Sequence, residues 1–272
     1  MPSGEQMPAF GMGTWEMGNL AAARAEELAT LRLGIDRGAA LIDTAEMYGE
    51  GVAEELVGEA IAGRRDEVFL VSKVYPHNAT RRGALQACER SLRRLRTDRL
   101  DLYLLHWRGQ VPLADTFEAF DELRLAGKIR HYGVSNFDVR DMREVMAASG
   151  GQAVQTNQVL YNLTRRGLEW ELLAWLRERR IPVMAYSPIE QGRLPGKRRL
   201  VAFARGCGMT PAQVALAWLL AKPDVIVIPK TSHRRRLEEN LGALDHPLDA
   251  RQLAELDGIF PPPDGPRPLE ML

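Results

Sequence analysis

The sequence has little of what disulfide-rich, membrane or secreted proteins require. Its 272 residues include two cysteines, Cys88 and Cys207, which belong to no CxxC or ligand-spaced cluster, so no disulfide framework is predicted. No apolar run is long enough to cross a membrane. The first residues, "MPSGEQMPAFGMG", lack the basic and apolar segments of a secretory signal. We therefore expect a cytoplasmic protein with no membrane partner.

Charge of either sign is not in excess. Lys plus Arg and Asp plus Glu number 36 each, so the formal net charge is zero and no nucleic-acid partner is predicted. The five histidines lack the spacing of zinc ligands, so no metal site is predicted either. The stretches "GMGTWEMG" (11–18) and "GRLPGK" (192–197) have the wrong spacing for a Rossmann fingerprint and for a P-loop.

What the chain does contain is a regular alternation of short apolar runs and amphipathic stretches. Strands are predicted at 7–13, 40–43, 68–74, 100–107, 129–136, 153–158, 181–187 and 225–231. Helices are predicted at 21–37, 52–62, 81–96, 113–126, 138–148, 167–179, 210–221 and 233–243, with Thr210 and Ser232 as N-caps of the last two. Eight such repeats predict an α/β fold in which a parallel sheet closes into a (β/α)8 TIM barrel.

No linker or change of composition divides the chain, so residues 1–272 are predicted to form a single domain. The stretch "FPPPDGPRPLEML" (260–272) is too rich in proline for regular structure. From about residue 260 we therefore expect an irregular tail, either a surface strap or a disordered segment.

Polar side chains stand at the carboxyl ends of the predicted strands. In a parallel barrel these ends meet at one rim, which is where the active sites of such barrels form. The residues concerned are Asp43, Ser72-Lys73, His106-Trp107, Ser135-Asn136, Asn157-Gln158, Tyr186-Ser187 and Lys230-Thr231. Tyr48 follows Asp43 on the next loop.

Asp43, Tyr48, Lys73 and His106 together suggest acid catalysis at a carbonyl. A free phenol titrates near ~10 and is a poor proton donor at neutral pH. An adjacent ammonium, here Lys73, is expected to lower the pKa of Tyr48, and Asp43 would hold that ammonium in place. Tyr48 could then protonate a carbonyl or alkoxide oxygen, an effect worth roughly 10²–10⁴ in rate. His106 would donate a hydrogen bond to the same oxygen.

Each of these residues also has an ordinary structural explanation when taken alone. Asp43 could cap a helix, Tyr48 could be a core tyrosine, Lys73 could extend its ammonium to solvent, and His106 could be a buried histidine with satisfied nitrogens. Their occurrence together at successive strand ends favours a common reactive centre.

This group of residues can polarise a carbonyl but supplies no electrons, which points to a nicotinamide cofactor. Ser135, Asn136 and Gln158 could hydrogen-bond its carboxamide, and Tyr186 offers a flat face for its ring. The stretch "PKTSHRRRLEEN" (229–240) brings Lys230 and Arg236 to a helix N-terminus. That combination suits a phosphate.

Two tryptophans fall at strand ends on the predicted rim. Trp15 follows the first strand and Trp107 the fourth, so they are the candidates for apolar walls of the substrate site.

The motifs in this order resemble those of the aldo-keto reductase superfamily. They are "GMGTW", "DTAEMYGEG", "VSKV", "LYLLHW", "GVSNF", "QTNQVLYN", "AYSPI" and "IPKT" followed by "RRLEEN". The resemblance extends from about Pro8 to about Leu248. Within the superfamily it resembles short bacterial members that reduce small aldehydes and dicarbonyls, such as methylglyoxal and diketogluconate reductases, because of "YSPIEQGRL" and the brief segment 108–114.

The resemblance implies a role for each motif residue. Asp43, Tyr48, Lys73 and His106 would form the catalytic tetrad of the family. Lys230 and Arg236 would bind the 2′-phosphate of NADPH. The other implied contacts of the cofactor are Gly13, Thr14, Ser135, Asn136, Gln158, Tyr186, Ser187, Thr231, Glu239 and Asn240.

The chain departs from the family pattern in three places. Thr231 stands where a serine is usual. The β-hairpin that normally plugs the barrel would be shortened or absent, because six residues precede Met7. The long loops of larger relatives are missing, so we expect an open pocket.

The predicted function is NADPH-dependent reduction of a small-molecule aldehyde or ketone, with a monomer as the expected state. Two other classes stay open at this point. One is a non-catalytic nicotinamide-binding sensor or regulatory subunit on the same fold, and the other is a phosphate-handling barrel isomerase.

Overall fold

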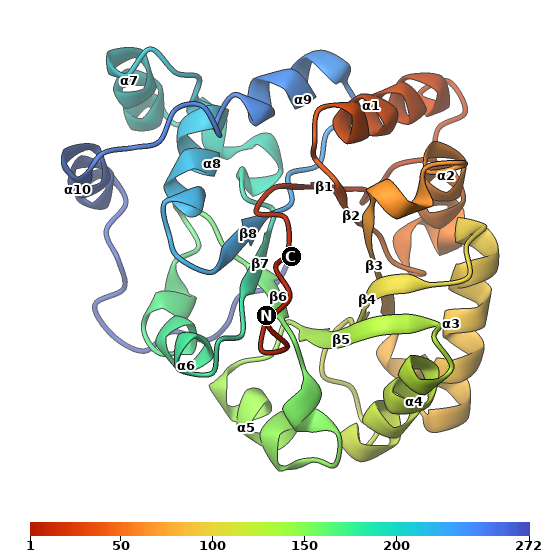
Figure 1. Ribbon diagram of the computed structural model, residues 1–272. Coiled ribbons are helices and arrows are strands. Elements are labelled where there is room, and N and C mark those ends of the chain that lie inside the picture. Colours follow the sequence, from red (N-terminus) through yellow and green to blue (C-terminus); the bar gives the residue numbers. More distant parts are fainter.

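The computed structural model describes all residues from Met1 to Leu272 and shows eight parallel strands in one sheet. Figure 1 shows them surrounding the centre of the molecule, with helices outside. Isolated bridges Phe10–Val227 and Gly13–Lys230 join the last strand to the first and close the barrel. The strands are β1 Gly11–Gly13, β2 Leu41–Asp43, β3 Phe69–Val74, β4 Leu100–Leu105, β5 Ile129–Ser135, β6 Asn157–Leu160, β7 Val183–Tyr186 and β8 Val225–Val227. The predicted (β/α)8 barrel is therefore confirmed.

The sixth strand was predicted too early in the chain. A single 3-10 turn, Gly151–Ala153, precedes it, and β6 begins at Asn157. The apolar character of 153–154 reflects burial in this turn rather than strand pairing, a distinction that a short apolar run does not make.

The eight predicted helices are present, most within a few residues of the expected bounds, and the structure adds two. The eight are α1 Arg24–Asp36, α2 Val52–Ala60, α3 Arg81–Leu95, α4 Leu113–Leu125, α5 Val139–Ala147, α6 Leu172–Glu178, α8 Pro211–Leu220 and α9 Arg234–Leu241. The additional helices are α7 Arg198–Gly206 and α10 Ala250–Ile259. The second of these has a sequence signal that was overlooked, a capping box between Asp249 and Gln252.

The two predicted helix caps had different outcomes. Thr210 and Gln213 form a capping box with Pro211 in the first turn of α8, as expected for an N-cap followed by proline. The prediction for Ser232 was wrong, because α9 is preceded by His233 and the Ser232 hydroxyl instead donates to Glu27 at 3.0 Å.

Strand alternation divides the interior into two apolar clusters. Side chains that face outward pack beneath the helices, in a cluster of 62 buried residues. Those that face inward fill the barrel itself, and they are Leu41, Phe69, Val71, Leu102, Leu104, Met184, Ile226 and Ile228. Every second residue of a strand faces the inside of the barrel. The residue two positions after the last inward apolar side chain therefore also faces inward, at the rim. Asp43, Lys73 and His106 follow Leu41, Val71 and Leu104 in this way.

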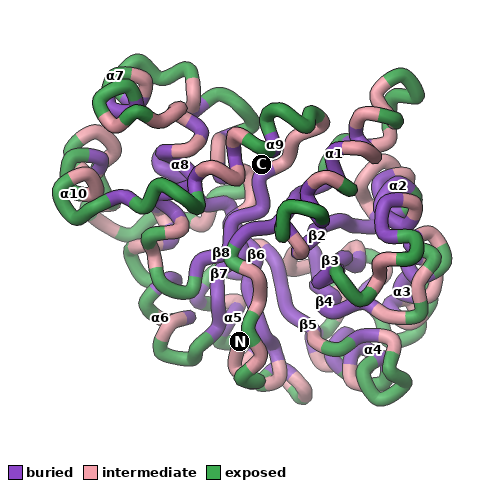
Figure 2. The backbone as a smooth tube through the Cα atoms, turned by 45° about the horizontal axis from the view of Figure 1, so that its top comes forward, coloured by how far each residue is buried: buried purple, intermediate pink, exposed green.

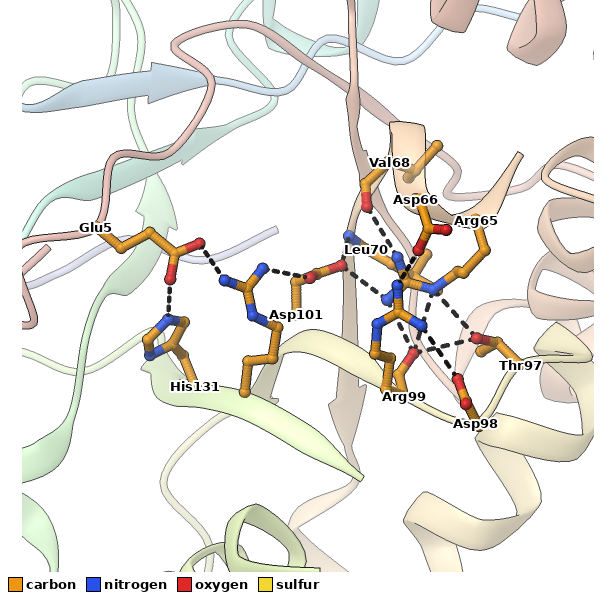
Figure 3. A network of polar contacts seen from close by, with 11 residues as sticks. Glu5, Arg65, Asp66, Val68, Leu70, Thr97, Asp98, Arg99, Asp101 and His131 are labelled. Carbon is orange, nitrogen blue, oxygen red and sulfur yellow. Dashed lines mark hydrogen bonds and ion pairs between the residues drawn. The ribbon is translucent and has the colours of Figure 1, made fainter. Parts of the chain in front are cut away.

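The amino-terminal residues cover the opposite end of the barrel. Met1 and Met7 pack against the interior cluster, and the Glu5 carboxylate contacts Arg130 at 2.7 Å and His131 at 2.6 Å. Arg130 also contacts the buried Asp101, which pairs with Arg65 (Figure 3). An irregular segment held by ion pairs thus covers this end of the barrel, and no helix or strand precedes Gly11.

The carboxyl-terminal residues reach the other end. No helix or strand follows Ile259. Figures 1 and 2 together show the two chain ends near the barrel axis but on opposite sides of the sheet. Met271 and Leu272 line the large pocket at the rim, so the tail is part of this site rather than only a surface strap. No helix is long and apolar enough to cross a membrane.

Candidate active site

A pocket of about 800 Å³ occupies the rim at the carboxyl ends of the strands. Every predicted site residue except Lys73 lines it; Lys73 lies immediately behind and is inaccessible to solvent. The lining residues at the predicted positions are Gly13, Thr14, Trp15, Asp43, Tyr48, His106, Trp107, Ser135, Asn136, Gln158, Tyr186, Ser187, Lys230, Thr231, Arg236, Glu239 and Asn240.

Lys73 is the centre of the polar contacts at the base of the pocket. Its ammonium donates to Asp43 Oδ2 at 2.8 Å, to the Thr44 carbonyl at 2.9 Å and to the Tyr48 hydroxyl at 3.1 Å. An ammonium has three protons, so each of them has an acceptor. Burial acts to lower the pKa of Lys73, but Asp43 and Tyr48 outweigh it, and the net direction is upward. Lys73 therefore stays charged.

Asp43 is held from two sides. Its second oxygen, Oδ1, accepts a hydrogen bond from Gln158 Nε2 at 2.7 Å. The side-chain nitrogen of Gln158 therefore donates to Asp43, and its side-chain carbonyl oxygen is the end that can bind a ligand. The sequence predicts a cofactor contact for Gln158 but gives no sign of this contact with Asp43.

The Tyr48 hydroxyl differs from expectation in its acidity. The pKa of Tyr48 is raised, because burial disfavours the phenolate more than the Lys73 ammonium favours it. The predicted lowering by Lys73 is present as an opposing contribution but does not determine the direction. The reason is the depth of the site, which a sequence does not give. Tyr48 is consequently a protonated phenol throughout the neutral range.

His106 is a neutral imidazole facing the same space. Burial, followed by the charge of Lys73, holds its pKa well below the usual 6.5. Nδ1 is buried without a hydrogen-bond partner, while the residue lines the pocket, so Nε2 is the nitrogen able to reach a ligand. The ring lies edge-on to Tyr48, with centroids 5.9 Å apart.

Asn136 adopts a left-handed backbone, with φ of 61°, directly after β5. Its amide nitrogen donates to the His106 carbonyl at 3.2 Å, and its oxygen accepts from the Tyr186 hydroxyl at 2.9 Å. These bonds fix the amide plane between the fourth and seventh strands. An asparagine tolerates this conformation better than most residues, which explains its place at the strand end.

The cationic end of the pocket is built by β8 and α9. Arg234 pairs with Glu26 at 2.9 Å, whereas Lys230 and Arg236 line the pocket and form no ion pair within the protein. Of the three consecutive arginines, Arg236 is the one that lines the pocket. Two unpaired cations beside the start of α9 fit a phosphate group.

Trp107, one of the two predicted tryptophans, packs against other aromatic rings. Trp107 packs against His106 and against Tyr75, with centroids 4.9 and 5.7 Å away. Tyr75 is held by its backbone nitrogen, which donates to the buried Glu46 at 2.9 Å. Lining residues that sequence reasoning missed are Glu16, Met47, Pro188, Ile189, Gln191, Gly192, Pro195, Ala212, Ile228, Ser232, His233, Met271 and Leu272. Most are apolar or on loops and carry no chemical signature, although "PIEQG" adjoins a motif that was recognised.

Residues 9–260 match the model of the Aldo/keto reductase family, and the chain belongs to that family. It is 48% identical to "Methylglyoxal reductase YeaE" of Escherichia coli (strain K12), over 98% of this chain and 95% of that protein. It is 34% identical to "Glyoxal reductase" of Bacillus subtilis (strain 168), over 99% of this chain and 95% of the relative.

Solved structures give the same placement. An aldo/keto reductase from Klebsiella pneumoniae, in complex with NADP and acetate, superposes with a TM-score of 0.96 at 49% identity, covering 98% of this chain and 96% of the other. A putative 2,5-diketo-D-gluconic acid reductase B superposes with a TM-score of 0.84 at 35% identity, covering 97% and 93%. The resemblance inferred from the motifs is thereby confirmed.

Proposed function

We propose that this protein is an NADPH-dependent reductase of small aldehydes and ketones, with Tyr48 as the proton donor. The observation that supports this most directly is the Tyr48 hydroxyl, 3.1 Å from the fully buried Lys73 ammonium and open to a large pocket. A phenol in this position can protonate an oxygen that becomes negative as a carbonyl is reduced.

The proposed reaction uses the residues of the chain in a fixed order. The carbonyl oxygen accepts hydrogen bonds from the Tyr48 hydroxyl and from His106 Nε2. Bound reduced nicotinamide supplies the hydride to the carbonyl carbon. Tyr48 gives its proton to the oxygen, and the Lys73 ammonium stabilises the phenolate that remains until solvent returns a proton. Asp43 keeps Lys73 charged and in place.

The residues at the pocket fit NADPH. The side-chain carbonyl of Gln158 would accept from the nitrogen of a carboxamide, Asn136 lines the pocket beside it, and Tyr186 offers its ring face. Lys230 and Arg236 have no counter-ion in the protein and would bind the 2′-phosphate. The Klebsiella relative, solved with NADP, supports the same assignment.

The lining of the pocket favours small neutral carbonyls. The basic side chains that line it, other than His106, are Lys230, His233 and Arg236, and all lie in the segment that follows β8. The walls elsewhere include Trp15, Met47, Trp107, Ile189, Met271 and Leu272, which cannot pair with a substrate carboxylate. We therefore propose dicarbonyls such as methylglyoxal and glyoxal, in keeping with the names of two relatives, over acidic sugars.

A sensor that binds the nicotinamide without turning it over is the second candidate from the sequence, and one assay separates the two. Initial rates of NADPH oxidation should rise with methylglyoxal concentration and saturate, with one alcohol formed per NADPH consumed. NADPH binding with no turnover of any tested carbonyl would favour the sensor.

The proposed setting is a reducing cytoplasm and the proposed state a monomer. Both cysteines are free thiols, one buried and one half-buried, as is usual in that compartment. The predicted tetrad and cofactor residues of a single chain already meet around this pocket. Analytical ultracentrifugation at assay concentrations would test the monomer directly.

A further inference from the structure

The loop that follows β7 has an unusual backbone. Ser187, Glu190 and Gln191 have φ values of 47°, 52° and 52°, in the left-handed region that side chains other than glycine and asparagine seldom adopt. Ser187, Pro188, Ile189, Gln191 and Gly192 all line the pocket. Such a conformation persists only where surrounding contacts impose it.

Glu190 supplies those contacts, because its carboxylate points away from the pocket and is buried. It accepts hydrogen bonds from Asn162 Nδ2 at 2.7 Å and from Arg165 Nε and Nη2 at 3.1 and 2.9 Å. Asn162 Nδ2 also donates to the Ser187 carbonyl at 2.9 Å. The loop after β7 is therefore held from the turn 162–165, which follows β6.

Arg165 has a second acidic partner on the carboxyl-terminal segment. Its Nη1 donates to Glu270, and the next two residues, Met271 and Leu272, line the pocket. The Leu272 backbone lies beside the Tyr186 hydroxyl, where it partly offsets the burial that raises the pKa of Tyr186. One guanidinium thus contacts the loop after β7 through Glu190 and the segment 260–272 through Glu270.

We propose that Arg165 is a positioning residue that couples these two walls of the pocket, so that a change in the tail alters affinity for the cofactor. A guanidinium suits this role because it is planar and presents separate nitrogens to two carboxylates in fixed directions. Arg165 does not line the pocket, so it acts through Glu190 and Glu270 and not on reacting atoms. This proposal depends on the proposed function in one respect, which is that NADPH is the ligand whose affinity changes.

The first test replaces Arg165 by alanine. We expect the Kd of NADPH, from quenching of protein fluorescence, to rise roughly tenfold through loss of charge-assisted bonds to Glu190. The KM for 4-nitrobenzaldehyde should rise severalfold, while kcat changes less than twofold. Arg165→Lys should recover only part of the loss, since an ammonium cannot reproduce the forked contact.

Two matched controls remove one arginine from each side. Arg193→Ala deletes a more exposed partner of Glu190, 3.1 Å away, that does not reach the tail. Arg267→Ala deletes an exposed tail arginine that pairs with Asp264. Both should leave Kd and KM within twofold of wild type. If either control matched Arg165→Ala, the effect would belong to general charge loss and the proposal would be overturned.

The decisive measurement is a double-mutant cycle with Glu270→Gln, an exposed change that should not disturb folding. In the parent protein it should raise the NADPH Kd about threefold, and in the Arg165→Ala background it should have no further effect. If Arg165→Ala does not fold, Arg165→Gln, which is longer than alanine and carries no charge for Glu270, takes its place in the cycle. Additive effects, or none from Glu270→Gln, would overturn the coupling. NADPH binding is measured without turnover. A protein that binds NADPH but reduces no carbonyl would therefore contradict the proposed function and leave the coupling proposal testable.

Discussion

The Lys73 ammonium lies 3.1 Å from the Tyr48 hydroxyl, although the residues are 25 positions apart in the chain. The Lys73 ammonium also contacts the Asp43 carboxylate at 2.8 Å. Both side chains are buried, so solvent does little to screen the attraction between them. The Lys73 ammonium thus lies between the Tyr48 phenol and the Asp43 carboxylate and contacts both. Burial keeps Tyr48 a neutral phenol, which is the form that the proposed proton transfer requires.

Removing the Tyr48 hydroxyl should abolish most carbonyl reduction and leave NADPH binding nearly unchanged. Tyr48→Phe is expected to lower kcat by about 10²–10⁴ or more, the range of general acid catalysis. The NADPH Kd should stay within about twofold, because the lost hydroxyl faces the carbonyl. Stopped-flow rates and fluorescence titration measure the two separately. A variant with wild-type kcat would show that another group donates the proton.

The pH profile should follow the state of Tyr48. Its pKa lies above 10, so carbonyl reduction should be independent of this group through neutral pH and fall as pH rises past the folded pKa. Oxidation of the alcohol requires the phenolate and should rise in that same range. Lys73→Met removes the charge that favours the phenolate, so the rise in oxidation should move to still higher pH. An unchanged profile in a folded Lys73→Met variant would contradict the assignment.

His106 should make stability sensitive to acid. Its folded pKa is depressed below 6.5, so the unfolded chain binds a proton that the folded chain refuses. The free energy of unfolding therefore decreases as pH falls below 6.5, by up to about 2 kcal/mol at pH 5 from this group. Urea denaturation at pH 7 and pH 5 should show a smaller decrease for His106→Gln. Equal decreases would mean that His106 is protonated in the folded state.

Cofactor choice should depend on Arg236. The ratio of kcat/KM for NADPH to that for NADH is expected to fall about tenfold or more in Arg236→Ala, because the lost contact is made only to the 2′-phosphate. The adjacent Arg234→Ala, which removes an ion pair with Glu26, is the control and should keep the wild-type ratio. Identical ratios in all three proteins would place the phosphate elsewhere.

Substrate charge should matter more than substrate size. The substrate walls carry no cation able to pair with a carboxylate, so 4-carboxybenzaldehyde should react with a kcat/KM at least tenfold below that of 4-nitrobenzaldehyde, which has nearly the same shape. The difference should appear mostly in KM. Comparable values for the pair would reveal a second anion site near the substrate, apart from Lys230 and Arg236.

Much of the site could be predicted from the sequence, because two rules of strand geometry place its residues together. Alternation on a strand puts Leu41 and Asp43, or Val71 and Lys73, on the same face, and a parallel barrel brings all such strand ends to one rim. Asp, Tyr, Lys and His side chains at one rim then suggest acid catalysis at a carbonyl. Each of these predictions uses residues close together in the sequence, so the sequence is enough to make them.

The tertiary structure alone decided the rest. The direction of the Tyr48 pKa depends on how completely water is excluded, and the roles of Met271, Leu272 and Arg165 depend on contacts between segments some hundred residues apart. The tail has no periodicity, and its path is set by what it packs against. Local pattern therefore fixed which side chains reach the rim, whereas long-range packing and desolvation fixed what encloses them and how they titrate.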